Sequence, residues 1–475
     1  MNARSRSPFR SPAWTVAATC IGFAVVQLDV TIVNVALPRI ASQLIGSQPI
    51  GSQLGGSVAL LQWVVDAYAL SFAVLLLSAG VLADRVGARR VYLAGFALFA
   101  VASAACGLAA GTLSLIVARA LQGVGAALLV PSSLALLNRA AAHDAALRVR
   151  AVGWWTAAGG VSIAFGPVAG GLLVEAFGWR SIFLVNVPLC ALGAWLTLRH
   201  VAGSRNSVKA RRFDPAGQLL AIAALGALVA VIIATPALGV RHPLIAAGLG
   251  VTLLAGWIFR AVEAHASDPM LPPELFRATG FGAAVTFGVA VNLTYYGAVF
   301  VLSLYLQQVR GYPPFDAGLA YLPLTATFIV ANLASARATA RYGPRASMLA
   351  GAAIGVAGFA LLGRLGGASS LPAMLPAFVL IPGGMGLAVP AMTTVVLSGV
   401  EARHAGTASG VLNAARQVGG AIGVAVFGAL ATGGPDRIIS GVHAASAISV
   451  FLLAAAATTA WIGVRPIRPA CEATV

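Results

Sequence analysis

Charged residues are scarce in this sequence: Asp, Glu, Lys and Arg together make up 9% of its 475 residues, whereas 59% are hydrophobic. The mean hydropathy of +0.91 lies far outside the range of soluble globular proteins. Polar stretches long enough for a soluble signalling domain are also absent, which argues against a membrane receptor or scaffold. We therefore expect an all-α protein that crosses the bilayer many times.

Lysine is almost absent, and this excludes one source of energy. A nucleotide-driven pump needs a phosphate-binding loop with its lysine, but the only lysine, Lys209, lies in no such loop. Cysteine is scarce as well, and its four positions have neither metal-ligand spacing nor the pattern of a disulfide framework. We expect no metal, no cofactor and no enzymatic activity, so that an ion gradient or another subunit would drive any transport.

Fourteen apolar windows are long enough to cross a hydrocarbon layer of about 30 Å as helices. They begin near Trp14, Val58, Val91, Leu113, Ala151, Ile182, Gly217, Pro243, Phe281, Ala317, Met348, Pro372, Ala405 and Val442.

Basic residues alternate from loop to loop, as the positive-inside rule predicts. If the N-terminus is cytoplasmic, the outside loops contain few of them: Arg39, Arg180, Arg241, Arg310, Arg364 and Arg437. The formal net charge of +17 therefore reflects membrane topology and does not indicate nucleic-acid binding. Both termini are placed in the cytoplasm.

A short basic turn occurs twice, as Arg85-Val86-Gly87-Ala88-Arg89 and as Arg341-Tyr342-Gly343-Pro344-Arg345. Each copy would join the second and third spans of a six-span block. The pattern predicts a 6+2+6 arrangement with a bundle at 1–200, a linker and two extra helices at 201–279, and a second bundle at 280–475. Parallel halves of this kind are typical of transporters whose substrate site lies between them.

Four charges fall inside apolar spans: Asp29, Asp66, Arg119 and Arg416. A charge near the bilayer centre costs at least ~3 kcal/mol, so it usually faces a partner or a water-filled cavity. Arg119 needs an anion, and Asp29 and Asp66 are the acids at comparable depth. The sequence does not choose between them, nor between a pair that opens during transport and a permanent structural ion pair.

Small and polar residues form three further groups. A conformational latch is predicted between the second and third spans, although a plain positive-inside turn would look similar: Gly80, Asp84, Arg85, Gly87, Arg89 and Arg90. Glycines and a proline predict a thin, kinked fifth span, with ordinary helix packing as the alternative: Gly153, Ser162, Gly166, Pro167, Gly170 and Gly171. Polar and aromatic residues predict a substrate cavity, with core packing as the alternative for the tyrosines: Gln27, Thr31, Asn34, Gln62, Gln122, Tyr295, Tyr296, Asn413, Arg416 and Gln417.

As a set, these motifs resemble the major facilitator superfamily, and within it the fourteen-spanning drug:proton antiporters. The resemblance is carried by Leu28–Pro38, Gln62–Tyr68, Gly80–Arg90, Arg119 with Gln122-Gly123, Gly166–Gly171, Trp179-Arg180, Tyr305–Tyr312 and Asn413–Gln417. Two positions depart from the family pattern. Ser162 stands where the pattern has glycine, and Ala340 precedes Arg341 where Asp84 precedes Arg85.

The resemblance implies a bacterial inner-membrane exporter that confers antibiotic resistance by exchanging protons for hydrophobic or cationic small molecules. Asp29, Asp66 and Arg119 would couple transport to protons, because burial favours the protonated form of an acid and so weakens its pairing with Arg119. The alternative is a proton symporter or facilitator that imports a metabolite. Membrane lipids are expected partners of the latch arginines, and the need for a periplasmic accessory protein is left open.

Overall fold

A computed structural model of the chain describes residues 12–45, 56–141, 144–202, 214–266, 269–400 and 405–465. All regular elements within these ranges are helical. Lys209 and the linker segment 203–213 lie outside the described residues.

The first part of the chain forms a run of helices joined by short connections. They are α1 (Pro12–Ile40), α2 (Gly56–Val86), α3 (Ala88–Gly107), α4 (Thr112–Ala140), α5 (Ala145–Phe177), α6 (Ser181–Leu184) and α7 (Asn186–His200). A hairpin of α8 (Pro215–Leu238) and α9 (Pro243–His265) follows. The last part comprises α10 (Pro273–Arg277), α11 (Phe281–Leu304), α12 (Pro314–Ala320), α13 (Leu322–Leu362), α14 (Leu371–Ser398), α15 (Ala405–Leu430) and α16 (Pro435–Gly463). Short π-helical turns extend α1 at Ala41–Ile45 and α11 at Tyr305–Val309.

Thirteen helical segments of the described chain are long and apolar enough to cross a membrane. The tenth of them, Pro314–Leu362, has 49 residues, which is much more than one crossing needs. Within it, α13 is interrupted at Gly343, whose backbone is not helical (φ 81°, ψ 159°). The two predicted spans that begin near Ala317 and Met348 correspond to the two arms of this segment. The count of fourteen crossings treats these arms separately and stays a prediction.

The repeated basic turn has the same backbone geometry in both copies. Gly87 has φ 104° and Gly343 has φ 81°, a region that only glycine enters without strain. Each glycine stands between two long helices, α2 and α3 in the first copy and the two arms of α13 in the second. The shared conformation supports the internal repeat that the sequence predicted.

Alanine at Gly343 is expected to lower thermal stability, because a Cβ at this positive φ costs about 1–3 kcal/mol. Alanine at Gly366 is the matched control, since nothing lies within 4 Å of a Cβ there and its φ is not positive. Thermal unfolding of the purified variants in detergent measures the effect. Equal melting temperatures for the two variants would contradict the role of the positive φ.

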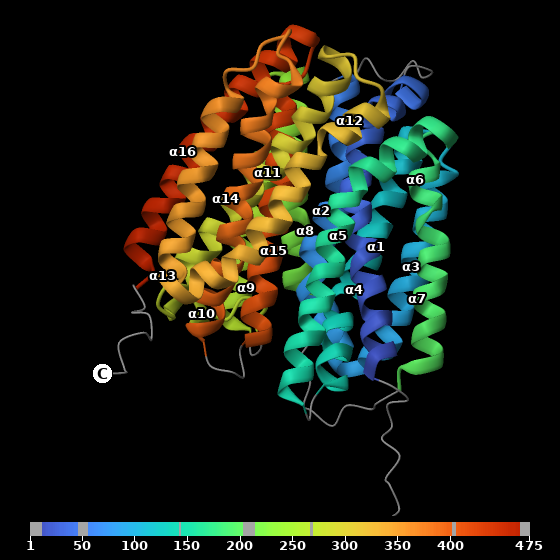
Figure 1. The fold of residues 1–475 in the computed structure, drawn as a ribbon, viewed down its shortest axis with the longest axis vertical. Coiled ribbons are helices and arrows are strands. Elements are labelled where there is room, and N and C mark those ends of the chain that lie inside the picture. Colours follow the sequence, from blue (N-terminus) through green and yellow to red (C-terminus); the bar gives the residue numbers. More distant parts are fainter. Residues whose placement is uncertain are drawn as a thin grey trace, which may run out of the picture.

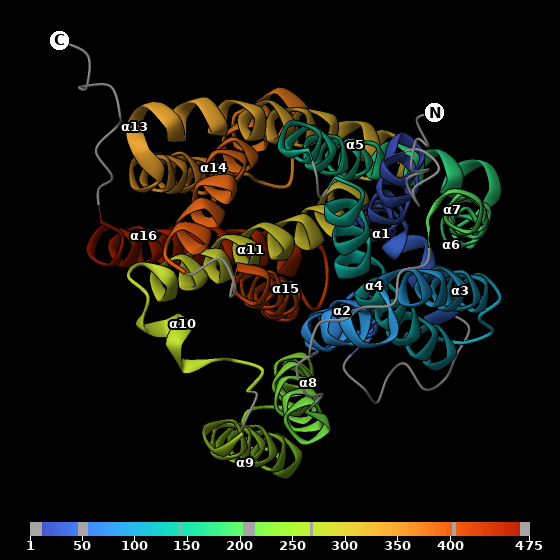
Figure 2. The same cartoon turned by 90° about the horizontal axis from the view of Figure 1, so that it is seen from below.

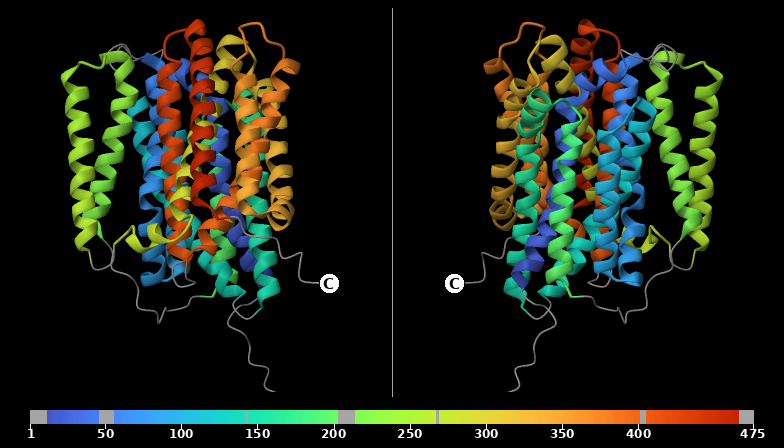
Figure 3. Two further views of the ribbon diagram at one scale, coloured as in Figure 1. Left: turned by 90° about the vertical axis from the view of Figure 1, so that its left-hand side faces the viewer. Right: turned by 90° about the vertical axis from the view of Figure 1, so that its right-hand side faces the viewer.

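The helices gather into two bundles and a separate hairpin (Figure 1). Seen along the helix axes, α1–α7 lie on one side, α11 and α13–α16 lie on the other, and α8 and α9 stand outside both (Figure 2). The hairpin contacts the bundles through α8, which packs on α2 and on α15 (Figure 3). We call these the N bundle and the C bundle. The boundaries at 1–200, 201–279 and 280–475 remain predictions.

Candidate functional site

Arg119 of α4 forms a buried ion pair with Asp29 of α1. The Nη1 atom of Arg119 lies 2.6 Å from Oδ2 of Asp29, and the two side chains are 1% and 0% exposed. This geometry resolves the choice that the sequence left open between the two acids. Asp66 is not the partner of Arg119 in this conformation.

Residues of α3, α4 and α7 form a hydrogen-bond network around the Asp29 carboxylate. Gln122 and Asn186 donate their amide groups to Oδ1 of Asp29, at 2.8 and 3.0 Å. Both amides also donate to the hydroxyl of Ser103, at 3.0 and 3.1 Å. Satisfied partners on both sides are what a buried ion pair requires to be stable. The network therefore fixes α1, α3, α4 and α7 within the N bundle.

Two members of this network were not among the predicted site residues. Ser103 and Asn186 are fully buried polar residues on apolar helices. The available signal was the amide of Asn186 inside an otherwise apolar span, the same kind of signal that identified Gln122.

Arg119 also holds α2. Its Nε atom donates to the carbonyl of Val64 at 3.0 Å, and its guanidinium lies 4.3 Å from the centre of the Tyr68 ring. These two residues are the second before and the second after Asp66 in the chain. The ion-pair network thus clamps the segment of α2 that carries Asp66.

Asp66 itself points away from this clamp. At about 100° per residue, it lies on the opposite face of α2 from Val64 and Tyr68 and shares its face with Gln62 one turn earlier. The amide of Gln62 donates to the carbonyls of Val424 and Ala425 on α15, at 3.2 and 2.6 Å. Asp66 therefore faces the contact between the two bundles.

The carboxylate of Asp66 is 0% exposed, and neither of its oxygens has a hydrogen-bond partner in the described part of the chain. No charged residue is present on the described length of α8, which packs on the same helix. An ionised carboxylate in such surroundings is strongly destabilising. Close packing here is compatible with a protonated Asp66.

The predicted latch ties helices within the N bundle. Arg89 donates to the carbonyl of Leu198 at the end of α7, at 3.0 Å. Gly80 faces Pro131 of α4, with 4.0 Å from its ideal Cβ position to the Pro131 Cβ. Asp84, Arg85 and Arg90 are exposed at the same end of the bundle. Its role as a conformational latch stays a prediction.

The predicted kink of α5 lies between the two bundles. Gly166 and Gly170 face Thr31 and Ile32 of α1, and an added Cβ on Gly170 would lie 2.8 Å from the Ile32 side chain. On the other side, a Cβ on Gly171 would lie 2.5 Å from the carbonyl oxygen of Pro314 on α12. These glycines allow α5 to pack closely on both α1 and α12 at the end of the molecule where α12 lies (Figure 1).

Toward the start of α5, the helix face that carries Pro167 lacks close neighbours at two glycines. Gly153, Gly160 and Pro167 follow one another at intervals of seven residues, so they share one helix face. Pro167 meets Gly318 of α12, whereas nothing lies within 4 Å of a Cβ at Gly153 or Gly160. Ser162 is half-buried between them. This face of α5 therefore meets α12 at Pro167 and has no close neighbour at Gly153 and Gly160.

A small cavity lies between the bundles. Its walls combine aromatic, apolar and uncharged polar side chains: Thr31, Asn34 and Val35 of α1, Ile163 and Pro167 of α5, Tyr295, Tyr296 and Val299 of α11, and Tyr321, Leu324 and Thr325. We call this the inter-bundle cavity. It contains four of the predicted cavity residues: Thr31, Asn34, Tyr295 and Tyr296.

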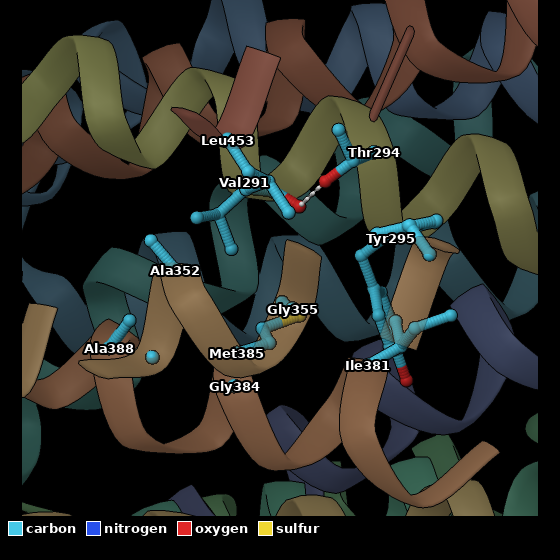
Figure 4. Close-up of a pocket in the computed structure, with 12 residues that line it drawn as sticks. Val291, Thr294, Tyr295, Ala352, Gly355, Ile381, Gly384, Met385, Ala388 and Leu453 are labelled. Atoms are coloured by element: carbon cyan, nitrogen blue, oxygen red, sulfur yellow. Dashed lines mark hydrogen bonds between the residues drawn. The ribbon is translucent and has the colours of Figure 1, made fainter. Parts of the chain in front are cut away.

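A second cavity lies inside the C bundle and has a different character (Figure 4). It is lined by glycines and apolar residues of α11, α13, α14 and α16, and the hydroxyl of its Thr294 is bonded to the carbonyl of Val291 at 3.1 Å. Tyr295 borders both cavities. Its walls are apolar apart from the hydroxyl groups of Thr294 and Tyr295, so we interpret this cavity as a gap in packing.

The remaining predicted cavity residues differ in their surroundings. Gln62 and Gln122 are buried, and their amides are bonded to protein groups. Gln27, Arg416 and Gln417 are half-buried, and Asn413 is exposed.

The chain matches the family model of the Major Facilitator Superfamily over residues 19–424. It is 39% identical over 421 residues to the multidrug resistance protein Stp of Mycobacterium tuberculosis, covering 89% of this chain and 76% of that one. It is 39% identical over 428 residues to the cephamycin export protein CmcT of Amycolatopsis lactamdurans, covering 88% and 86%. Among solved structures, the xylose transporter XylE of E. coli in a partially occluded inward-open conformation is similar in fold, with a TM-score of 0.65, 13% identity, and coverage of 96% and 98%.

Proposed function

Since this chain belongs to the major facilitator superfamily, we propose that it is a proton-coupled antiporter that exports hydrophobic small molecules. The efflux role is supported by relatives that are named for multidrug resistance and for export of cephamycin. Proton coupling is supported by one observation above all, the buried and unpartnered carboxylate of Asp66 at the contact between the bundles.

The topology that we propose has fourteen crossings in a 6+2+6 arrangement, with the two arms of α13 as separate spans. The α12 end faces the outside, and the end at which α2 and α3 join faces the cytoplasm, in agreement with the arginine-rich turns. The protein would lie in a bacterial inner membrane, with both termini in the cytoplasm. The conformation described here is then closed to the outside.

Asp66 is the group that we propose to load the proton. When the carboxyl is neutral, α2 and α15 can pack closely, as they do here. When it is ionised, the unpartnered charge favours water between the two helices and thus separation of the bundles at the outer end. A proton taken up from outside would therefore allow the inward-facing state to form, and its release inside would allow the return.

The Asp29–Arg119 network has a supporting role in this proposal. It lies within the N bundle and holds α2 on either side of Asp66. We propose that it stays intact during transport and fixes the direction in which Asp66 points. This assignment gives the two acids different roles, in place of the shared role that the sequence suggested.

The inter-bundle cavity is the proposed substrate site. Three tyrosines and several apolar side chains would bind a hydrophobic ring system, and uncharged polar groups of Thr31, Asn34 and Thr325 would add hydrogen bonds. No charged side chain lines this cavity. The predicted preference for cations would rest on the tyrosine rings alone.

Transport by the purified protein in proteoliposomes tests the proposal. Vesicles are loaded with ethidium, a pH gradient is imposed with the exterior or the interior acidic, and dye and proton fluxes are followed together. We expect dye to leave the compartment that protons enter. Movement of dye and protons in the same direction would favour the symporter, and dye movement that ignores the gradient would favour a facilitator.

A further inference from the structure

Arg416 of α15 is the intramembrane cation that the coupling mechanism does not use. Its Nε atom is buried without a hydrogen-bond partner. None of the ion pairs or hydrogen bonds found among the described residues involves its guanidinium, in contrast to Arg119, which has five polar and aromatic neighbours. An intramembrane arginine with no partner is costly and usually functional.

The faces of α15 show where Arg416 points. Gly419 and Gly423 pack on Val289 and Leu293, so their face meets α11. Gly410 packs on Leu77, which places another face against α2.

The surface of α15 between these two faces lies toward the space between the bundles, because α2 belongs to the N bundle and α11 to the C bundle (Figure 2). At about 100° per residue, this surface holds Asn413, Arg416 and Gly420. Asn413 is exposed, which shows that the surface is open at that level.

Two glycines make room for this arginine beside the inter-bundle cavity. A Cβ on Gly288 of α11 would lie 3.1 Å from Cγ of Arg416, so the missing side chain accommodates the stem of the arginine. A Cβ on Gly420 would lie 3.1 Å from the ring of Tyr296, which lines the inter-bundle cavity. Tyr296 is also close enough to Arg416 for an electrostatic interaction between the two side chains. The guanidinium therefore stands next to a wall of the cavity.

The surroundings offer no acid to balance this charge. The described lengths of α11, α13, α14 and α15 contain no aspartate or glutamate. Asp29 is bound by Arg119, and Asp66 makes no contact with Arg416 among the described interactions. Arginine is suited to a planar carboxylate, to which it donates two parallel hydrogen bonds.

We propose that Arg416 binds a carboxylate on the exported molecule, so that hydrophobic acids are preferred over neutral or cationic molecules of similar shape. This inference rests on the proposed function, because it assigns a substrate class to the same cavity. The ring system would pack against Tyr295 and Tyr296, and the carboxylate would meet the guanidinium. Asn413 lies on the same helix face and can donate a further hydrogen bond.

Binding of 2-naphthoate and of 2-naphthamide to the purified full chain tests the proposal, since the two probes share ring and shape and differ in charge. Isothermal titration is carried out on the wild type, R416Q and R416K. We expect the wild type to bind naphthoate about tenfold more tightly than naphthamide, as one charge-assisted hydrogen-bonded contact allows. R416Q removes this preference without weakening naphthamide, and R416K retains part of it. R345Q, at an arginine that stacks on Trp461 of α16 instead, keeps the preference.

Several results would overturn the proposal. They are equal binding of the two probes by the wild type, binding of neither, or equal weakening of both in R416Q. Loss of proton dependence in R416Q with an unchanged preference for naphthoate would also overturn it and would assign Arg416 to coupling. Ethidium efflux distinguishes this failure from failure of the proposed function. If the wild type exports ethidium in response to a proton gradient, the antiporter proposal is supported whatever Arg416 binds. If the wild type does not export ethidium but prefers naphthoate, only the proposed binding site is supported.

Discussion

Replacing Asp66 by asparagine is expected to abolish proton-driven export while the protein remains folded and still exchanges substrate. Asparagine has the shape of the protonated acid and carries no charge, so the close contact of α2 with α15 is preserved. The driving force is lost because no proton is taken up or released at this position. In proteoliposomes, ethidium flux under a pH gradient falls to that of empty vesicles, and counterflow without a gradient continues.

The matched control for this variant is Asp436→Asn. Asp436 is an exposed acid in the first turn of α16, far from the contact between the bundles. We expect full coupling in this control. Full coupling in Asp66→Asn as well would remove Asp66 from the mechanism, and loss of counterflow together with coupling would indicate a damaged substrate site instead.

Replacing Arg119 by glutamine is expected to reduce the amount of folded protein severely. The change leaves Asp29 buried and without its cation, which typically costs about 3–5 kcal/mol. The contacts of Arg119 with Val64 and Tyr68 are lost at the same time. Fluorescence-detected gel filtration and thermal unfolding measure the effect, with Arg39→Gln at an exposed arginine as the control.

A second substitution separates a structural pair from a coupling pair. If the Asp29–Arg119 pair is permanent, Asp29→Asn added to Arg119→Gln removes the uncompensated charge and recovers part of the lost stability. If the pair opens and closes during transport, the single variants fold well and lose only coupling. The second outcome would restore the role that the sequence suggested for Asp29.

The membrane class and the repeat were predictable from the sequence because they depend on local features. Apolar windows identify spans from composition and length. The glycine of each basic turn was visible as a repeated position, and it adopts a positive φ in both copies. The number of separate spans was harder to predict, because the arms of α13 form one long helical segment with a break only at Gly343.

The roles of the two acids were not predictable, because both lie at similar depth in apolar spans. Their difference arises from tertiary packing. Asp29 meets Arg119, Gln122 and Asn186 from two other helices, whereas Asp66 meets no donor in the described chain. The stripe with Arg416 was visible from its spacing. That this surface of α15 lies between α2 and α11 required the positions of the neighbouring helices.

The distance between the bundles at the outer end, measured as a function of pH, tests the central claim most directly. Spin labels are placed at the exposed positions Leu108, at the end of α3, and Ser440, in α16, after the native cysteines are replaced. The end of α3 and the first turns of α16 lie at the α12 end of the molecule (Figure 1).

The wild type should be closed at this end in acidic buffer and should gain a population with longer distances as the buffer is made alkaline and Asp66 ionises. Asp66→Asn should keep the short distance under both conditions. A pH-dependent opening in Asp66→Asn equal to that of the wild type would show that another group controls the contact and would contradict the account.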